Sequence, residues 1–250
     1  MNSYTKFINR HTVSACVFLF FITSAAVRFW LGNFSKVIGI YHDELCYYAI
    51  AKSLSVGHGV MVQNLPYDYP KILYSILLLP AFYLPAGSAR ITIITLINAI
   101  TISSGIFPTY LIINKISNNR KISLVGALFY ILLPDMWYSA EFMSEVLFLP
   151  LALWCVYALL QLLLEDTGHP YRWVAGYALF LTLSIFTKEV AMYIHAAWLG
   201  YIILYGLLQF FLTKHAGVRE KNYNDTLIKQ SDPLCRNKER TLWHIPARQP

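Results

Sequence analysis

Long apolar stretches separated by short polar segments make up most of the chain. Residues 12–31 are apolar enough to cross a bilayer as one helix, which needs about 20 residues. Four further stretches predict the remaining spans: residues 90–113, 122–138, 145–164 and 173–212. The last stretch is too long for one span, so we expect it to break at Thr187-Lys188-Glu189. The pattern predicts an all-α polytopic transmembrane protein with about six spans.

The polar loop after the first span contains a second helical pattern, from Asp43 to Val56. Its two faces are Tyr47, Ile50, Ala51 and Leu54 on one side, and Glu44, Tyr48, Lys52 and Ser55 on the other. An amphipathic helix of this kind lies flat in the membrane interface. Its first turn carries Asp43 and Glu44, where the helix dipole favours negative charge.

Basic residues predict the orientation of the spans, because cytoplasmic loops are enriched in Lys and Arg. The N-terminus, the loop at residues 114–121 and the tail after Thr213 are basic, so we expect all three in the cytoplasm. The acidic loops around Asp43 and at residues 135–145 then lie together on the outer side. This assignment requires the short apolar stretch at residues 71–84 to enter the membrane without crossing it.

Composition agrees with a polytopic membrane protein, which we expect in the plasma or inner membrane. The chain is 57% hydrophobic and 13% charged, whereas soluble domains carry about 25% charged residues. The net charge of +7 does not indicate nucleic-acid binding, because the basic residues lie mainly at span ends and in the tail. We expect a transmembrane module at residues 1–212 and a basic, disordered cytoplasmic tail at residues 213–250.

The outer loops carry the candidate chemistry. Asp43 is a candidate general base or a carboxylate ligand for Mg²⁺ or Mn²⁺, and the alternative is a helix-capping acid at the membrane surface. Glu44 is the weaker catalyst, because one helical step rotates it by about 100° from Asp43. Glu141 and Glu145 are four residues apart and share a helix face. Glu145 begins a span, where an acid is costly and is commonly functional.

Three basic residues are expected near these acids on the outer side: Lys71, Arg90 and Lys188. Cations on this side run against the orientation rule. One explanation is an anionic ligand such as a lipid-linked phosphate, and the other is snorkelling of the side chains to the interface. Aromatic residues such as Tyr48 are suited to stacking on a sugar or to forming the usual interfacial belt.

Four segments carry a resemblance to a known family, and together they span about residues 10–212. They are Asp43-Glu44 at the head of the interfacial helix, Tyr-Asp-Tyr-Pro-Lys-Ile-Leu-Tyr from Tyr67 to Tyr74 followed by Gly87-Ser88-Ala89-Arg90, Ser144-Glu145-Val146-Leu147-Phe148, and Leu183-Ser184-Ile185-Phe186-Thr187-Lys188. In their order and spacing they resemble the N-terminal half of GT-C membrane glycosyltransferases, which include protein O-mannosyltransferases and lipid A aminoarabinose transferases.

The resemblance implies a transferase that uses a polyprenyl-phosphate sugar as donor and a lipid, glycan or protein as acceptor. It assigns Asp43 to catalysis as base or metal ligand, with Glu44 in support and Glu145 as second acid. Lys71 and Lys188 become candidates for the donor phosphate. Arg90, Tyr48 and Glu141 become further substrate-binding candidates, and Asp43 and Glu145 would hold any divalent cation.

Two other functions stay open at this point. Family members usually continue with more spans, whereas this chain turns polar at Thr213, so we also expect a truncated copy, in the extreme an inactive fragment that binds a partner. A transporter or flippase-like carrier of lipid-linked sugar would need acids within the spans, and Glu189 is the candidate near mid-segment.

Overall fold

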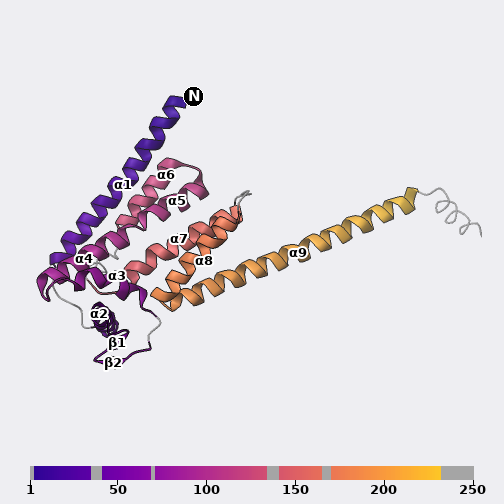
Figure 1. The fold of residues 1–250 in the computed structure, drawn as a ribbon. Coiled ribbons are helices and arrows are strands. Elements are labelled where there is room, and N and C mark those ends of the chain that lie inside the picture. The colour runs from indigo at the N-terminus through magenta and orange to yellow at the C-terminus, as the bar shows by residue number, and fades with distance from the viewer. Residues whose placement is uncertain (1–2, 35–40, 69–70, 134–140, 165–169, 232–250) are drawn as a thin grey trace, which may run out of the picture. The chain divides into compact units, whose positions relative to one another are not determined.

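The computed structural model describes residues 3–34, 41–68, 71–133, 141–164 and 170–231, and almost all of them are helical. The first part of the predicted acidic loop, the end of the predicted span at 122–138 and the end of the tail lie outside these ranges. The elements are α1 (Ser3–Phe34), α2 (His42–Ser55), β1 (Met61–Val62), β2 (Leu65–Pro66), α3 (Leu73–Phe82), α4 (Ser88–Ser103), α5 (Ile106–Ser117), α6 (Arg120–Ile131), α7 (Glu145–Leu164), α8 (Pro170–Thr187) and α9 (Val190–Ser231) (Figure 1).

The all-α class and the membrane character are confirmed. Four segments of the described chain are long and apolar enough to cross a bilayer: His11–Phe34, Ser88–Ser117, Glu145–Leu164 and Val190–Phe211. The other two predicted spans correspond to α6 and α8, which are not among these four. The count of six spans therefore stays a prediction.

Contacts divide the chain into two units, residues 1–193 and 194–250. The predicted break between the last two spans is confirmed, because α8 ends at Thr187 and α9 begins at Val190. The predicted start of the tail at Thr213 does not coincide with a helix end, since α9 continues to Ser231. Helix propagation is cooperative and meets no proline before Pro233, which explains why α9 continues through polar sequence.

The segment at residues 90–113 is interrupted, which the hydrophobic pattern did not predict. Helix α4 ends at Ser103 and α5 begins at Ile106. A Cβ atom on Gly105 would overlap the ring of Tyr130 from α6, so this position requires glycine. The Tyr130 hydroxyl donates a hydrogen bond of 2.7 Å to the carbonyl oxygen of Ile102, which lies in the last turn of α4.

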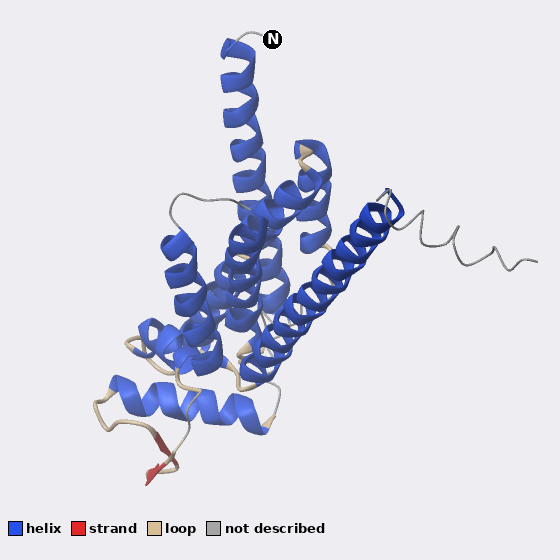
Figure 2. Cartoon of the chain, turned by 90° about the vertical axis from the view of Figure 1, so that its right-hand side faces the viewer, coloured by secondary structure: helices blue, strands red, loops and turns tan. Residues whose placement is uncertain are grey.

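Helix α2 is confirmed as the amphipathic element of the first loop, and it lies across the ends of the neighbouring helices (Figure 2). Tyr47, Ile50 and Ala51 are buried as predicted, but the assignment of Glu44 to the polar face was wrong, because its side chain is 1% exposed. A short antiparallel hairpin follows α2, and its turn at Gln63 and Asn64 has φ values of 54° and 65°.

Two groups of buried apolar residues form the core of residues 1–193. The α2–α3–α4–α7 cluster comprises Tyr47, Ala51, Tyr74, Leu78, Ala81, Phe82, Ile94, Ile102, Phe142 and Val146. The α1–α5–α6 cluster comprises Val17, Ile106, Ala127 and Tyr130. The predicted site residues lie around the first of these clusters.

Candidate functional site

Glu44 connects the two acidic loops. Its Oε1 atom accepts a hydrogen bond of 3.0 Å from the backbone N–H of Phe142, which is 98 residues away in sequence. Its Oε2 atom accepts a bond of 3.4 Å from the backbone N–H of Tyr41, as in a capping box at the start of a helix. Both carboxylate oxygens therefore bind main chain, so Glu44 fixes the segment before α7 against α2.

Further hydrogen bonds fix the same segment. The Tyr47 hydroxyl donates to Ser144 Oγ at 3.0 Å, and Ser144 Oγ lies 3.5 Å from Glu145 Oε2. The amide of Asn98 donates to the carbonyl oxygen of Glu141 at 3.0 Å. Asn98 in turn accepts a bond of 3.0 Å from the Tyr74 hydroxyl. Side chains of α2, α3 and α4 thus set the backbone that carries Glu141 and Glu145.

The predicted acids and lysines meet in two ion pairs. Lys188 forms a close ion pair with Glu145 at the start of α7. Lys71 precedes α3, and its Nζ atom lies 3.4 Å from Oε1 of Glu189. Lys188 and Glu189 are adjacent in the turn between α8 and α9. One turn therefore contributes a cation to one pair and an anion to the other.

Glu141 has an environment unlike that of a surface acid. Its pKa is raised first by burial and then by the negative charges of Glu44 and Glu145. Three carboxyl groups from two distant loops are therefore close enough to interact. The effect of this cluster is to favour the protonated form of Glu141.

Arg90 lies beside α2 and does not pair with an acid in the contacts of the described residues. Its guanidinium donates to the Tyr48 hydroxyl at 3.1 Å and to the carbonyl oxygen of Leu84 at 2.8 Å. It also lies over the ring of Phe82, 4.9 Å from the centroid, in a cation–π contact. Arg90 and Tyr48, both predicted to bind substrate, therefore bind each other.

Asp43 is exposed and has different neighbours from Glu44. Its charge acts on Cys46 and Tyr67, whereas the charges that act on Glu141 are those of Glu44 and Glu145. Burial raises the pKa of the Cys46 thiol, a hydrogen bond with Tyr67 lowers it, and Asp43 raises it further. The structure thus groups Glu145 with Glu44 and Glu141 rather than with Asp43.

The predicted cation site consists of two carboxylates, those of Asp43 and Glu145. No group of three His, Cys, Asp or Glu side chains within the described ranges is arranged to hold a metal ion. The Glu145 carboxylate is also balanced by the Lys188 ammonium. A divalent cation held by Asp43 and Glu145 therefore stays a prediction.

Sequence reasoning missed several polar residues that the structure buries. Arg28 is fully buried within the first candidate span, where its Nε donates to Ser24 Oγ at 3.2 Å. Ser24 in turn lies 2.9 Å from Ser103 Oγ of α4. The signal available in the sequence was an arginine inside an apolar run, which is costly without partners. Ser144 and Asn98 carried no such signal, because their partners are distant in sequence.

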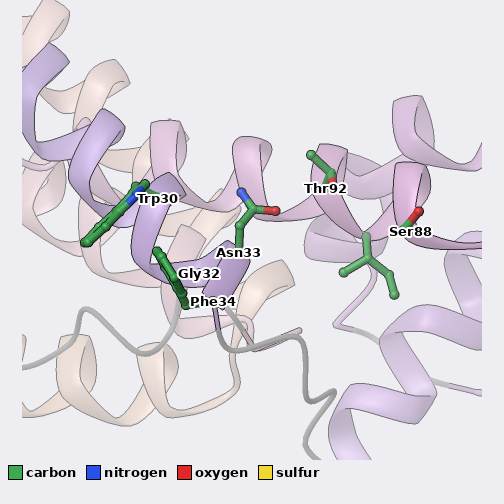
Figure 3. Close-up of a pocket in the computed structure, with 7 residues that line it drawn as sticks. Trp30, Gly32, Asn33, Phe34, Ser88 and Thr92 are labelled. Carbon is green, nitrogen blue, oxygen red and sulfur yellow. The ribbon is translucent and has the colours of Figure 1, made fainter.

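A pocket of about 470 Å³ lies at the end of α1 and the start of α4. Figure 3 shows Asn33 and the aromatic rings of Trp30 and Phe34 on α1, with Ser88 and Thr92 on α4. None of the predicted acids or lysines lines it. The acids and lysines around Glu145 supply the ionisable groups that acid–base chemistry requires, so they form the better candidate site.

Comparison with known proteins adds no relative. No protein-family model, no curated protein and no solved structure matches this chain.

Proposed function

We propose that this chain is a membrane glycosyltransferase that moves a sugar from a polyprenyl-phosphate donor to a lipid, glycan or protein acceptor at the outer face. The supporting observation is the convergence of Glu44, Glu141 and Glu145 with Lys188 at the start of α2, the start of α7 and the end of α8, together with the second ion pair of Lys71. In this proposal the N-terminus and the tail are cytoplasmic, which places the acidic loops outside.

The proposed chemistry divides between carboxylates and lysines. The acceptor hydroxyl or amine attacks the anomeric carbon and gives its proton to a carboxylate, for which the exposed Asp43 is the first candidate and Glu145 the second. The bond between the anomeric carbon and the phosphate oxygen breaks, and the lipid phosphate leaves with the electron pair. Lys188 and Lys71 stabilise the charge that develops on this oxygen.

The position at the helix ends suits a donor with a lipid tail. The polyprenyl chain stays in the bilayer, so its phosphate is presented at the membrane surface. Helix α2 lies across the ends of the neighbouring helices (Figure 2), and its Glu44 binds the N–H of Phe142 ahead of α7. A carrier of lipid-linked sugar is less well supported, because Glu189 lies in the turn between α8 and α9 rather than within a span.

The test is transfer of radiolabelled sugar from a polyprenyl-phosphate donor by the full chain in proteoliposomes. We expect Asp43→Asn and Glu145→Gln each to abolish transfer while membrane insertion is unchanged. Asp68→Asn is the matched control, because Asp68 is an exposed acid in the same loop as Asp43. Full activity in Asp43→Asn would remove the catalytic role of Asp43, and absence of transfer by the native chain would overturn the proposal.

The orientation has its own test. A single cysteine introduced at Asn118, in the turn between α5 and α6, should react with a membrane-impermeant thiol reagent only after the membrane is opened. Labelling from outside would place the basic loop externally and contradict the proposed topology.

A further inference from the structure

The turn between α8 and α9 takes part in two ion pairs, as the cation of one and the anion of the other. Its Lys188 pairs with Glu145 at the head of α7, and its Glu189 pairs with Lys71 ahead of α3. The turn thus carries one cation and one anion, and each is paired with a residue of opposite charge outside the turn. Because Lys188 and Glu189 are consecutive residues, movement of this turn affects both pairs together.

The four side chains differ in their access to water. Glu145, Lys71 and Lys188 are 24%, 21% and 33% exposed, whereas Glu189 is 56% exposed. An exposed carboxylate exchanges readily, because an ion pair in contact with water contributes little net free energy. Glu189 is therefore the carboxylate that an incoming anion displaces at lower cost.

We propose that a phosphate ester binds here by exchange: it displaces Glu189 from Lys71 and Glu145 from Lys188. The inference rests on the proposed function, because it deepens the role given there to the two lysines. The exchange changes ion pairs only, with no covalent bond formed or broken and no proton transferred. Phosphate is a suitable competitor, since its oxygens accept several charge-assisted hydrogen bonds from lysine ammonium groups.

Exchange has a consequence for the acids. While Glu145 is paired with Lys188, the lysine ammonium occupies its Oε1 atom. Displacement leaves this oxygen without its cation, next to the bound phosphate. Binding of the phosphate thus uncovers the Glu145 carboxylate at the moment when a donor is in place.

The hydrogen bonds of the surrounding segment restrict the displacement to side chains. Glu44 holds the N–H of Phe142, and Asn98 holds the carbonyl oxygen of Glu141, so the backbone before α7 is fixed. Glu145 remains within reach of Ser144 Oγ, 3.5 Å from its Oε2. This contact involves the oxygen that Lys188 does not bind, so the carboxylate keeps it when the ion pair is broken.

The experiment measures binding of dodecyl phosphate to the purified full chain in a neutral maltoside detergent by calorimetry. We expect Glu189→Gln to bind about fivefold more tightly than the native chain, since the competing carboxylate is gone. Lys188→Gln and Lys71→Gln should each weaken binding about tenfold. Asp68→Asn removes the same charge from an exposed residue of the first outer loop, outside these pairs, and should leave the affinity unchanged.

The outcomes separate the inference from the proposed function. If Glu189→Gln and Asp68→Asn bind dodecyl phosphate equally more tightly than the native chain, the gain in affinity comes from overall charge. That result would overturn the exchange. Weaker binding in the lysine variants without tightening in Glu189→Gln would keep the phosphate site and reject the exchange. Binding that no lysine variant alters would reject both. An unchanged unfolding temperature in each variant ensures that the affinities refer to folded protein.

Discussion

The α2–α3–α4–α7 cluster and the α1–α5–α6 cluster are assembled by different interactions. Around the first, hydrogen bonds join residues far apart in sequence, such as Glu44 with Phe142 and Tyr47 with Ser144. The second consists mainly of apolar and aromatic contacts, such as Phe21 against Phe107 with ring centroids 5.1 Å apart. The first arrangement resists small changes in geometry, whereas the second tolerates them except at Tyr130, whose hydroxyl binds the carbonyl oxygen of Ile102.

This difference corresponds to the roles we assign. Apolar packing supplies stability but accepts alternative arrangements, while buried hydrogen bonds penalise any arrangement that leaves a partner unsatisfied. A site that aligns a carboxylate and lysines needs the second property. The α1–α5–α6 cluster needs only to hold its helices together.

The largest stability effect is expected in the apolar cluster. Ile106→Ala removes a fully buried side chain from the α1–α5–α6 cluster and should lower the free energy of unfolding by about 2–5 kcal/mol. Chemical denaturation in detergent measures this change. Ile116→Ala is the control, because Ile116 is 66% exposed and should show little effect. Equal losses of unfolding free energy in both variants would mean that burial of Ile106 does not stabilise the protein.

The next effect distinguishes two adjacent acids. Glu44→Leu leaves the N–H of Phe142 without its carboxylate partner and should cost about 1–3 kcal/mol of unfolding free energy. Asp43→Asn should leave stability almost unchanged, because Asp43 is exposed, while it abolishes transfer. Thermal unfolding and transfer assays on both variants test this contrast. Similar unfolding temperatures for the two would contradict the role of Glu44 as the link between the loops.

A smaller effect is expected for one hydrogen bond within the polar network. Tyr47→Phe removes the donor to Ser144 and should cost about 0.5–1.5 kcal/mol. Ser144→Ala should cost a similar amount, and the double variant should cost less than the sum, because both changes remove the same bond. Strict additivity in this double-mutant cycle would show that the two residues do not interact.

The smallest effect concerns pH. The pKa of Glu141 is raised in the folded protein, mainly by burial. Between the ordinary pKa of a glutamate and this raised value, the folded state therefore binds more protons than the unfolded state. Its contribution to stability is present below the ordinary pKa of a glutamate and is lost as pH rises through the raised value. The unfolding temperature of the native chain should therefore fall relative to that of Glu141→Gln as pH rises, and a constant difference would contradict this.

The sequence predicted local elements well. Helix α2 was expected from Asp43 to Val56 and is observed from His42 to Ser55, because its periodic pattern and acidic first turn are local signals. The break at Thr187-Lys188-Glu189 followed from the length limit on a span. Both features depend on residues that are close together in the chain.

Features that depend on distant partners were not predicted. The hydrogen bond of Glu44 with the N–H of Phe142 joins residues 98 positions apart and had no signal in the sequence, whereas the burial of Glu44 follows from its helical spacing with Tyr47 and Ala51. The interruption between α4 and α5 depends on Tyr130, which comes from α6. The grouping of Glu145 with Lys188 was expected only at the level of topology, since hydrophobic patterns place residues on a side of the membrane but not in contact.

The contact between Tyr130 and Gly105 also bears on the order of assembly. The chain is synthesised from its N-terminus, so α4 and the start of α5 exist before Tyr130 has been added. In the folded protein the carbonyl oxygen of Ile102 accepts from the backbone N–H of Gly105 at 3.2 Å and from the Tyr130 hydroxyl at 2.7 Å. The second of these bonds, at the interruption between α4 and α5, therefore requires a residue that is translated after both helices.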